Sequence, residues 1–398
     1  MNIKRFFGPS TLVAAAFIGP GTLTTCTMAG VEMSYRLIWV MLFAIFATIV
    51  LQEMAARLGW ITQQGLGEAL NRQFIGGVAR YFVFFLVIGA ILVGNAAYEA
   101  GNISGGILGL ELILGEFSLW PIIIGIVCFA LMYFGKYKAI ERILVGLVIL
   151  MSLCFLITAI LVKPDIGDVF RGFIPGPLSG SEWLIVMALI GTTVVPYNLF
   201  LHASTISKKY KTTSSLADIR IENAVSIVLG GMISILIIIT AAATSGQVAA
   251  VTSAADLATQ LEPLFGESAR LFMGIGLMAA GVSSALTAPL AAAYAARGLF
   301  NWQNDEQDWK FRAVWIGILA IGVVVSITNL PRVLIIKFAQ ITNAILLPLI
   351  VIYLMYLANS KKIMQKHTNG WVSNLFGVIV VLVTLMLSFR GVSRALGW

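Results

Sequence analysis

Charge is what this sequence has least of. Only 11% of its 398 residues are Asp, Glu, Lys or Arg, whereas about 25% is usual in soluble domains. Hydrophobic residues make up 59%, and the mean hydropathy is +0.94. These values exclude a soluble enzyme and a nucleic-acid-binding module, and they indicate an integral membrane protein. The net charge of +8 is therefore expected to set orientation in the bilayer and to contact anionic lipid.

Cysteine and histidine are also scarce. The three cysteines, Cys26, Cys128 and Cys154, lie in apolar stretches without CxxC spacing, which excludes a disulfide framework and a cysteine metal cluster. The apolar spans contain no nucleophile–base set and no cofactor motif. We therefore expect neither an enzyme nor a bound cofactor.

Apolar runs long enough to cross a bilayer recur along the whole chain. They fall near 9–30, 37–58, 79–108, 117–135, 141–163, 180–207, 222–246, 264–297, 312–328, 332–358 and 371–390. The sequence thus predicts one all-α transmembrane domain of eleven helices over 1–398. Most of the 26 Lys and Arg residues collect on one side when the N-terminus is placed in the cytoplasm, which puts the C-terminus outside. We expect a monomer, crossing the plasma or inner membrane many times.

Two of these spans are interrupted near their middle. The first contains Gly19-Pro20-Gly21-Thr22, and the sixth contains 191–197 (Gly-Thr-Thr-Val-Val-Pro-Tyr). Proline removes a backbone donor and glycine tolerates unusual dihedrals, so both helices are expected to unwind there. A simple proline kink is the alternative for either break alone. Unwound backbone at this depth must line a cavity or be buried in protein.

The positions of the breaks suggest an internal repeat. Each opens a set of five spans, about 9–163 and about 180–358, and the helix near 371–390 follows as an extra element. Five is odd, so the second set runs inverted relative to the first. This pattern is typical of secondary transporters that work by alternating access, with the substrate between the two breaks.

Several segments carry a resemblance to a known family. They are Phe7-Gly8-Pro9 onward to Gly21, 37–40 (Leu-Ile-Trp-Val), 51–59 (Leu-Gln-Glu-Met-Ala-Ala-Arg-Leu-Gly), 191–196 and 199–202 (Leu-Phe-Leu-His). The chain resembles the Nramp metal-ion transporters over nearly its whole length. The resemblance implies the leucine-transporter fold and transport that is usually coupled to protons.

The metal site of that family is not matched. Nramp proteins bind a transition metal through an Asp-Pro-Gly-Asn motif in the first helix and a methionine before the proline of the sixth. The corresponding residues here are Gly19, Thr22 and Val195. The carboxylate, the amide and the soft sulfur donor are all absent, so no metal site is carried over from the family.

Other polar groups surround the two breaks and define a candidate site. The set comprises the backbone at Gly19 and Gly21 with Thr22, Thr192, Val195, Tyr197, Gln340, Asn343 and Lys337. Exposed N–H groups where the helix resumes after the first break would suit a carboxylate or another anion. Each threonine could instead bond its own helix backbone, and Lys337 could instead extend to the outer interface.

Two ionisable residues are candidates for proton coupling. Glu99 lies inside the third span, and His202 lies near the end of the sixth. The resemblance matches both to residues that assist proton movement, but the family's second acidic residue of the third helix is replaced by Ala96. Glu99 could instead be a hydrogen-bonded structural acid, and His202 could serve packing.

The leading hypothesis is therefore an Nramp-related secondary transporter that moves a small polar solute bearing a carboxylate, rather than a transition metal, with a proton as a possible co-substrate. The first alternative is transport of a divalent cation such as magnesium or manganese, since Mg²⁺ keeps much of its water and needs few charged ligands. The second is a receptor-like protein on a transporter fold, with a site filled by Val195 and Tyr197.

Overall fold

The computed structural model describes residues 18–73, 78–135, 137–180, 182–248, 250–302 and 307–395. Within these residues, nine helical segments are long and apolar enough to cross a membrane, and Trp120–Tyr133 is a shorter apolar helix. One of the nine, Pro20–Thr62, holds two helices joined by a 3-10 turn. The described part of the chain therefore contains the eleven predicted crossings, although residues 9–17 of the first lie outside it.

The crossings follow one another along the chain in two groups of five. The first group is α2 (Pro20–Met33), α3 (Ile38–Thr62), α5 (Val78–Leu114), α6 (Trp120–Tyr133) and α7 (Tyr137–Leu161). The second group is α9 (Glu182–Thr193) with α10 (Pro196–Lys209), then α11 (Leu216–Thr244), α14 (Ala269–Phe300), α15 (Trp309–Ile327) and α16 (Arg332–Asn359). The extra helix is α18 (Trp371–Ala395).

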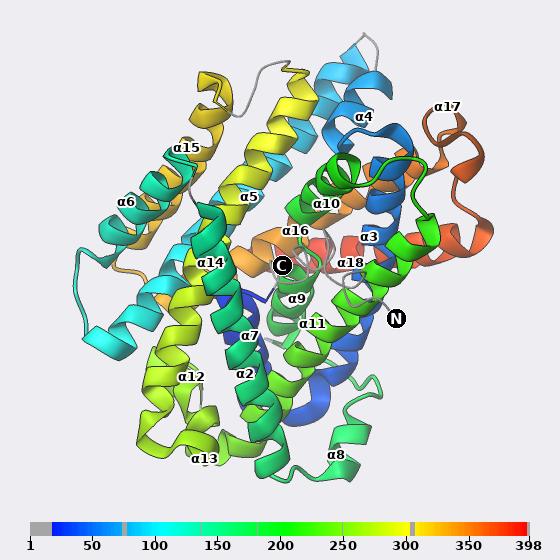
Figure 1. Ribbon diagram of the computed structural model, residues 1–398. Helices are drawn as coiled ribbons and strands as arrows, with labels where there is room; N and C mark the ends of the chain where they lie inside the picture. Colours follow the sequence, from blue (N-terminus) through cyan, green and yellow to red (C-terminus); the bar gives the residue numbers. More distant parts are fainter. Residues whose placement is uncertain are drawn as a thin grey trace.

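Short helices lie at the two ends of the bundle (Figure 1). One end carries α8 (Ile166–Arg171), α12 (Ala254–Ala258) and α13 (Glu262–Phe265), and the other carries α4 (Leu66–Gln73) and α17 (Lys361–Met364). The main departure from the predicted ranges is α5, which continues to Leu114 rather than ending near 108. It spans more than a bilayer's width, since each helical residue adds 1.5 Å.

The two groups of helices pack on each other as an inverted repeat. The first four members of one group contact their counterparts in the other: α2 packs on α9, α3 on α11, α5 on α14, and α6 on α15. Together with the discontinuous first and sixth crossings, this arrangement is the leucine-transporter fold that the sequence predicts. Its architecture brings the two breaks together at the centre of the bundle.

Glycines allow α5 and α14 to cross almost backbone to backbone. A Cβ on Gly281 would lie 2.4 Å from the backbone N of Gly106, and a Cβ on Gly109 would lie 2.3 Å from the backbone N of Met278. Such close approach is how helices associate where the surrounding lipid provides no hydrophobic driving force. The crossing fixes α5 as a rigid support for the centre of the protein.

The end of the bundle that holds α4 and α17 is tied together by a buried arginine. Arg57 of α3 is 3% exposed and donates from Nε to Glu53 at 3.0 Å. Its other nitrogens donate to the His367 carbonyl and to Asn369, in the segment before α18. Arg220 of α11 also donates to Glu53, at 2.9 Å. The cluster joins α3, α11 and the linker before α18.

We expect Gly281→Ala to destabilise the protein by about 1–3 kcal/mol, because the new methyl group meets backbone atoms that cannot move aside. The measurement is the thermal unfolding midpoint in detergent. Gly146→Ala on α7 is the matched control, since a Cβ at Gly146 meets no atom within 4 Å. Equal midpoints for the two variants would contradict the tight crossing.

Candidate functional site

In the described parts of the first and sixth crossings, a helix begins at a proline. Gly19 is extended (φ −103°, ψ −174°) and Pro20 begins α2. In the sixth crossing α9 ends at Thr193, Val195 is extended, and Pro196 begins α10. Proline suits the first helical position because its missing N–H would have no helical partner there. The same missing N–H denies the Thr192 carbonyl its usual helical hydrogen bond, which explains why the helix stops.

The side chain and backbone of one residue, Gln340 of α16, lie between the two broken crossings. A Cβ on Gly21 would be 2.2 Å from Gln340 Nε2, and a Cβ on Gly191 would be 1.9 Å from the Gln340 backbone oxygen. Both glycines are therefore required for the approach of α16. The Gln340 side chain is 1% exposed, and its Oε1 has no hydrogen-bond partner among the described residues.

Threonine hydroxyls connect the two breaks directly. Thr22 Oγ1 and Thr192 Oγ1 are 2.9 Å apart, and both residues are fully buried. By contrast, Thr25 donates to the Gly21 carbonyl and Thr193 to the Leu189 carbonyl, one turn back in their own helices. The helix-bonding alternative thus describes Thr25 and Thr193, whereas Thr22 and Thr192 face each other across the site.

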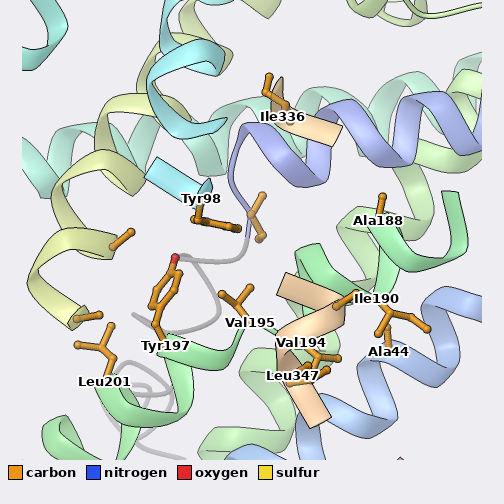
Figure 2. Packing of buried hydrophobic residues seen from close by; sticks show 14 of the residues in the cluster. Ala44, Tyr98, Ala188, Ile190, Val194, Val195, Tyr197, Leu201, Ile336 and Leu347 are labelled. Atoms are coloured by element: carbon orange, nitrogen blue, oxygen red, sulfur yellow. The ribbon is translucent and has the colours of Figure 1, made fainter. Parts of the chain in front are cut away.

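Two tyrosines meet beside the second break. The rings of Tyr98 on α5 and Tyr197 on α10 are 5.3 Å apart and nearly perpendicular, and Figure 2 shows the Tyr197 hydroxyl directed toward Tyr98, with Val195 alongside. Both residues are 1% exposed. The Tyr98 hydroxyl interacts with those of Tyr197 and Thr192, but neither tyrosine hydroxyl makes a hydrogen bond of good geometry to a described residue. Buried hydroxyls normally make well-formed hydrogen bonds, so these two keep hydrogen-bonding capacity that a bound solute could use.

The place where the family carries its aspartate is occupied by other groups. A Cβ on Gly19 would lie 3.0 Å from Ser284 Oγ of α14 and 4.0 Å from the Tyr98 hydroxyl. A carboxylate side chain there would have to push Ser284 aside. No group of three or more His, Cys, Asp and Glu residues able to hold a metal is found among the described residues. The donors at the centre are neutral hydroxyl and amide groups.

The two remaining residues of α16 that the sequence suggests for the site lie in different surroundings. Asn343 is 1% exposed, and its Oδ1 is 3.4 Å from a Cβ position on Gly94 of α5. Its Nδ2 has no hydrogen-bond partner among the described residues. Lys337 is partly exposed and interacts electrostatically with Glu32 near the end of α2. Asn343 therefore extends the buried polar cluster, whereas Lys337 lies toward the end of the bundle that carries α8.

The two candidates for proton coupling are both fully buried. Glu99 accepts a hydrogen bond at 3.3 Å from Asn102 on its own helix, its Oε1 has no partner among the described residues, and its side chain packs against Gly322 of α15. His202 Nδ1 is 2.8 Å from Gln52 Oε1 of α3. The two lie on different helices, Glu99 on α5 and His202 on α10.

Sequence reasoning missed Tyr98 and Ser284. A signal for Tyr98 was present, because Asn95 and Tyr98 are three residues apart in one helix and so share a face. Ser284 gives no such signal: it lies in a run of small residues on α14 that reads only as a packing face. Its nearness to Gly19 follows from the crossing of α14 with α2 and α5.

A discontinuous pair of helices around buried polar groups, within an inverted repeat, defines a secondary transporter of the leucine-transporter class. The structure of the amino-acid-binding protein MhsT in complex with L-phenylalanine has this fold, with a TM-score of 0.61, 15% identity, and coverage of 95% of this chain and 98% of that one. A mutant of the Eremococcus coleocola manganese transporter is more similar, with a TM-score of 0.79, 20% identity, and coverage of 98% and 87%.

The chain belongs to the Nramp family. The family model described as natural resistance-associated macrophage protein-like matches residues 10–394. A relative from Latilactobacillus sakei, named divalent metal cation transporter MntH, is 28% identical over 97% of this chain and 88% of its own length. The protein is therefore a multi-pass membrane transporter of a family that is not one of enzymes.

The two glycines around Gln340 should respond differently to alanine. We expect Gly191→Ala to destabilise the protein by about 1–3 kcal/mol, because its methyl group meets backbone, and Gly21→Ala to cost less, because its methyl group meets the flexible end of a side chain. Adding Gln340→Ala should restore the Gly21→Ala midpoint and leave that of Gly191→Ala low. The measurement is thermal unfolding in detergent. Rescue of both glycine variants would show that the backbone contact at Gly191 is absent.

Proposed function

We propose that this protein is a secondary transporter of a divalent cation, which it binds through neutral oxygens and retained water. The observation that carries the proposal is a set of buried oxygens beside the two breaks that make no hydrogen bond of good geometry in the described part of the chain: the hydroxyls of Tyr98 and Tyr197 and Oε1 of Gln340. Three uncharged oxygens from α5, α10 and α16 can accept contacts from a cation that keeps several waters.

The nature of these donors favours a hard cation. Hydroxyl, amide and carbonyl oxygens suit Mg²⁺, Ca²⁺ and Mn²⁺, whereas thioether and thiolate sulfur favour softer metals. Val195 stands where the family has methionine. The sulfur of Met41 on α3 is 3.9 Å from the hydroxyl of Thr193, the last residue of α9 before the break. Magnesium also loses its water reluctantly, so it fits this site better than a metal that requires full dehydration.

The names of the relatives point the same way. The proteins from Latilactobacillus sakei and Listeria welshimeri, each 28% identical to this chain, are both named divalent metal cation transporters. A change from a carboxylate and sulfur site to a neutral oxygen site would preserve the scaffold and the charge of the cargo while altering which ion is selected.

Removing one hydroxyl from the site should slow transport. We expect Mg²⁺ uptake into proteoliposomes to fall by about tenfold or more in Tyr98→Phe and Tyr197→Phe, since a hydrogen bond or ligand contact to a charged group contributes about 1.5–3 kcal/mol. The initial rate is followed with a trapped fluorescent indicator, with Mn²⁺ assayed in parallel.

Tyr133→Phe is the matched control, because Tyr133 is 44% exposed at the end of α6 and is distant in sequence from both breaks. It should transport at the rate of the unaltered protein. Folded protein that takes up neither cation faster than empty vesicles would sink the proposal, as would tyrosine variants that match Tyr133→Phe.

A carboxylate-bearing organic solute is the second candidate. It is favoured by the start of α2, where the N–H group of Gly21 precedes the hydrogen bond that Leu23 donates to the Gly19 carbonyl at 3.2 Å. Helix N-termini attract anions. The Gln340 carboxamide lies against Gly21, so such a solute would have to displace it.

A thermal-shift screen separates the two candidates, because a ligand at one hundred times its dissociation constant stabilises the folded state by about 2.7 kcal/mol. Stabilisation by small organic acids but not by Mg²⁺ or Mn²⁺ would favour the organic solute. If neither the organic acids nor the cations stabilise the protein, and no transport is measured, the receptor-like alternative is favoured, in which Val195 and Tyr197 fill the site.

Glu99 is our candidate for coupling the cation to a proton. A carboxyl group buried to this degree is costly to ionise, whereas a dication bound near the adjacent Tyr98 favours the charged form. Cation entry would then release a proton from Glu99. His202, whose Nδ1 is 2.8 Å from Gln52 Oε1 of α3, is the second candidate residue on the path of the proton.

We therefore expect Glu99→Gln to abolish the proton flux that accompanies cation uptake, measured with a pH-sensitive dye inside the vesicles, and His202→Gln to slow it. Glu116→Gln, which alters an exposed carboxylate beyond the end of α5, should leave that flux unchanged. If the proton flux of Glu99→Gln equals that of the control, Glu99 does not couple cation uptake to the proton.

A further inference from the structure

An apolar groove runs along the outside of the bundle between α5 and α15. It has a volume of about 650 Å³ and is lined on the α5 side by Leu92, Val93 and Ala96 and on the α15 side by residues from Lys310 to Ile321. Gly317 forms part of its floor, where a Cβ would meet no atom within 4 Å. Figure 1 shows α15 at the periphery of the bundle, beside α6 and away from the two broken crossings.

The length of the groove matches one leaflet of a bilayer. Lys310 and Ile321 are eleven residues apart on one helix, which corresponds to about 16 Å. Half of a hydrocarbon core about 30 Å thick is about 15 Å. The groove therefore extends from a membrane interface to the bilayer midplane, the depth that a phospholipid acyl chain occupies.

The interfacial end of the groove has the residues of a headgroup site. Trp302 and Trp309 line it, and Trp309 is 72% exposed. Tryptophan is enriched at the level of lipid headgroups. Lys310, whose Nζ is 6.0 Å from the centre of the Trp309 ring, supplies a positive charge. The Asp308 side chain accepts a hydrogen bond from the Lys310 backbone N–H and thereby caps the N-terminus of α15.

A neighbouring groove on the other side of α15 offers a comparison. It lies between α6 and α15, has a volume of about 350 Å³, and is lined only by apolar residues such as Phe129 and Val324. None of its lining residues is charged. Size and charge together thus distinguish the groove between α5 and α15 from the ordinary lipid-facing surface.

We propose that this groove is a binding site for one anionic phospholipid, whose acyl chain lies along Gly317 and whose headgroup phosphate contacts Lys310. The leaflet concerned is the one that the distribution of basic residues predicts to be cytoplasmic, where anionic lipids attract Lys and Arg. The end of the acyl chain reaches Ile321, next to Gly322, against which Glu99 packs. A bound lipid thereby covers the contact between α5 and α15 that encloses Glu99.

The site can be tested by native mass spectrometry of the purified protein, delipidated and then mixed with phosphatidylglycerol or phosphatidylcholine of equal chain length. We expect the protein to retain phosphatidylglycerol in preference. Lys310→Glu should reduce that preference by about fivefold or more, as expected for loss and reversal of one basic charge at a lipid surface. Gly317→Leu should reduce retention of phosphatidylglycerol by filling the groove.

Gly146→Leu is the control for Gly317→Leu, because Gly146 is an exposed glycine of α7 with equally free space around it. It should bind lipid as the unaltered protein does. Ala313→Leu is a second groove-filling change, at an exposed residue. It keeps the site testable if Gly317→Leu fails to fold.

Equal retention of the two lipids by the unaltered protein would overturn the proposal, as would groove-filling variants that retain phosphatidylglycerol as well as Gly146→Leu. A dimer that Gly317→Leu disrupts would identify a second copy of the chain as the occupant and would also overturn it. Lipid retention does not depend on which solute is transported, so this result stands apart from the test of cation uptake.

Discussion

The close fit of α16 against the two interrupted crossings is the contact on which the rest of the site depends. Gly21 lies against the Gln340 side chain and Gly191 against its backbone, and neither position has room for a methyl group in this arrangement. This contact brings the Thr22 and Thr192 hydroxyls within 2.9 Å of each other and encloses both tyrosines. Each half of the repeat thus supplies one break, and the last helix of the second half holds the two together.

The centre of the protein is closed, since the polar residues that surround the breaks are almost completely inaccessible to solvent. Access to these residues therefore requires some of the helices packed around the breaks to move apart. The α5–α14 crossing, with its backbone contacts, is a rigid element against which such movement can occur. Buried Arg57 joins α3 to the linker before α18 at the end of the bundle that holds α4 and α17.

The site shows how a scaffold can keep its geometry and change its chemistry. Where the family has a carboxylate, this chain has Gly19, next to the Ser284 hydroxyl. Where the family has sulfur, this chain has Val195. The remaining donors are neutral, so a cation bound here would be held by dipoles and by its own water rather than by a fixed negative charge. Glu99, one residue from Tyr98, is the acidic group that we propose responds to that charge.

The sequence by itself determined the class of the protein, because hydropathy and the lack of charge require membrane helices, and proline and glycine at matching places require two breaks. The beginnings of α2 and α10 at Pro20 and Pro196 followed directly. Only the tertiary structure decided which polar groups meet. Tyr98, Ser284 and Gln340 come from three helices distant in sequence, and their convergence depends on helix crossings that leave no local pattern. Lys337, three residues before Gln340, shares a helix face with it, yet packing places it beside Glu32 and away from the buried centre.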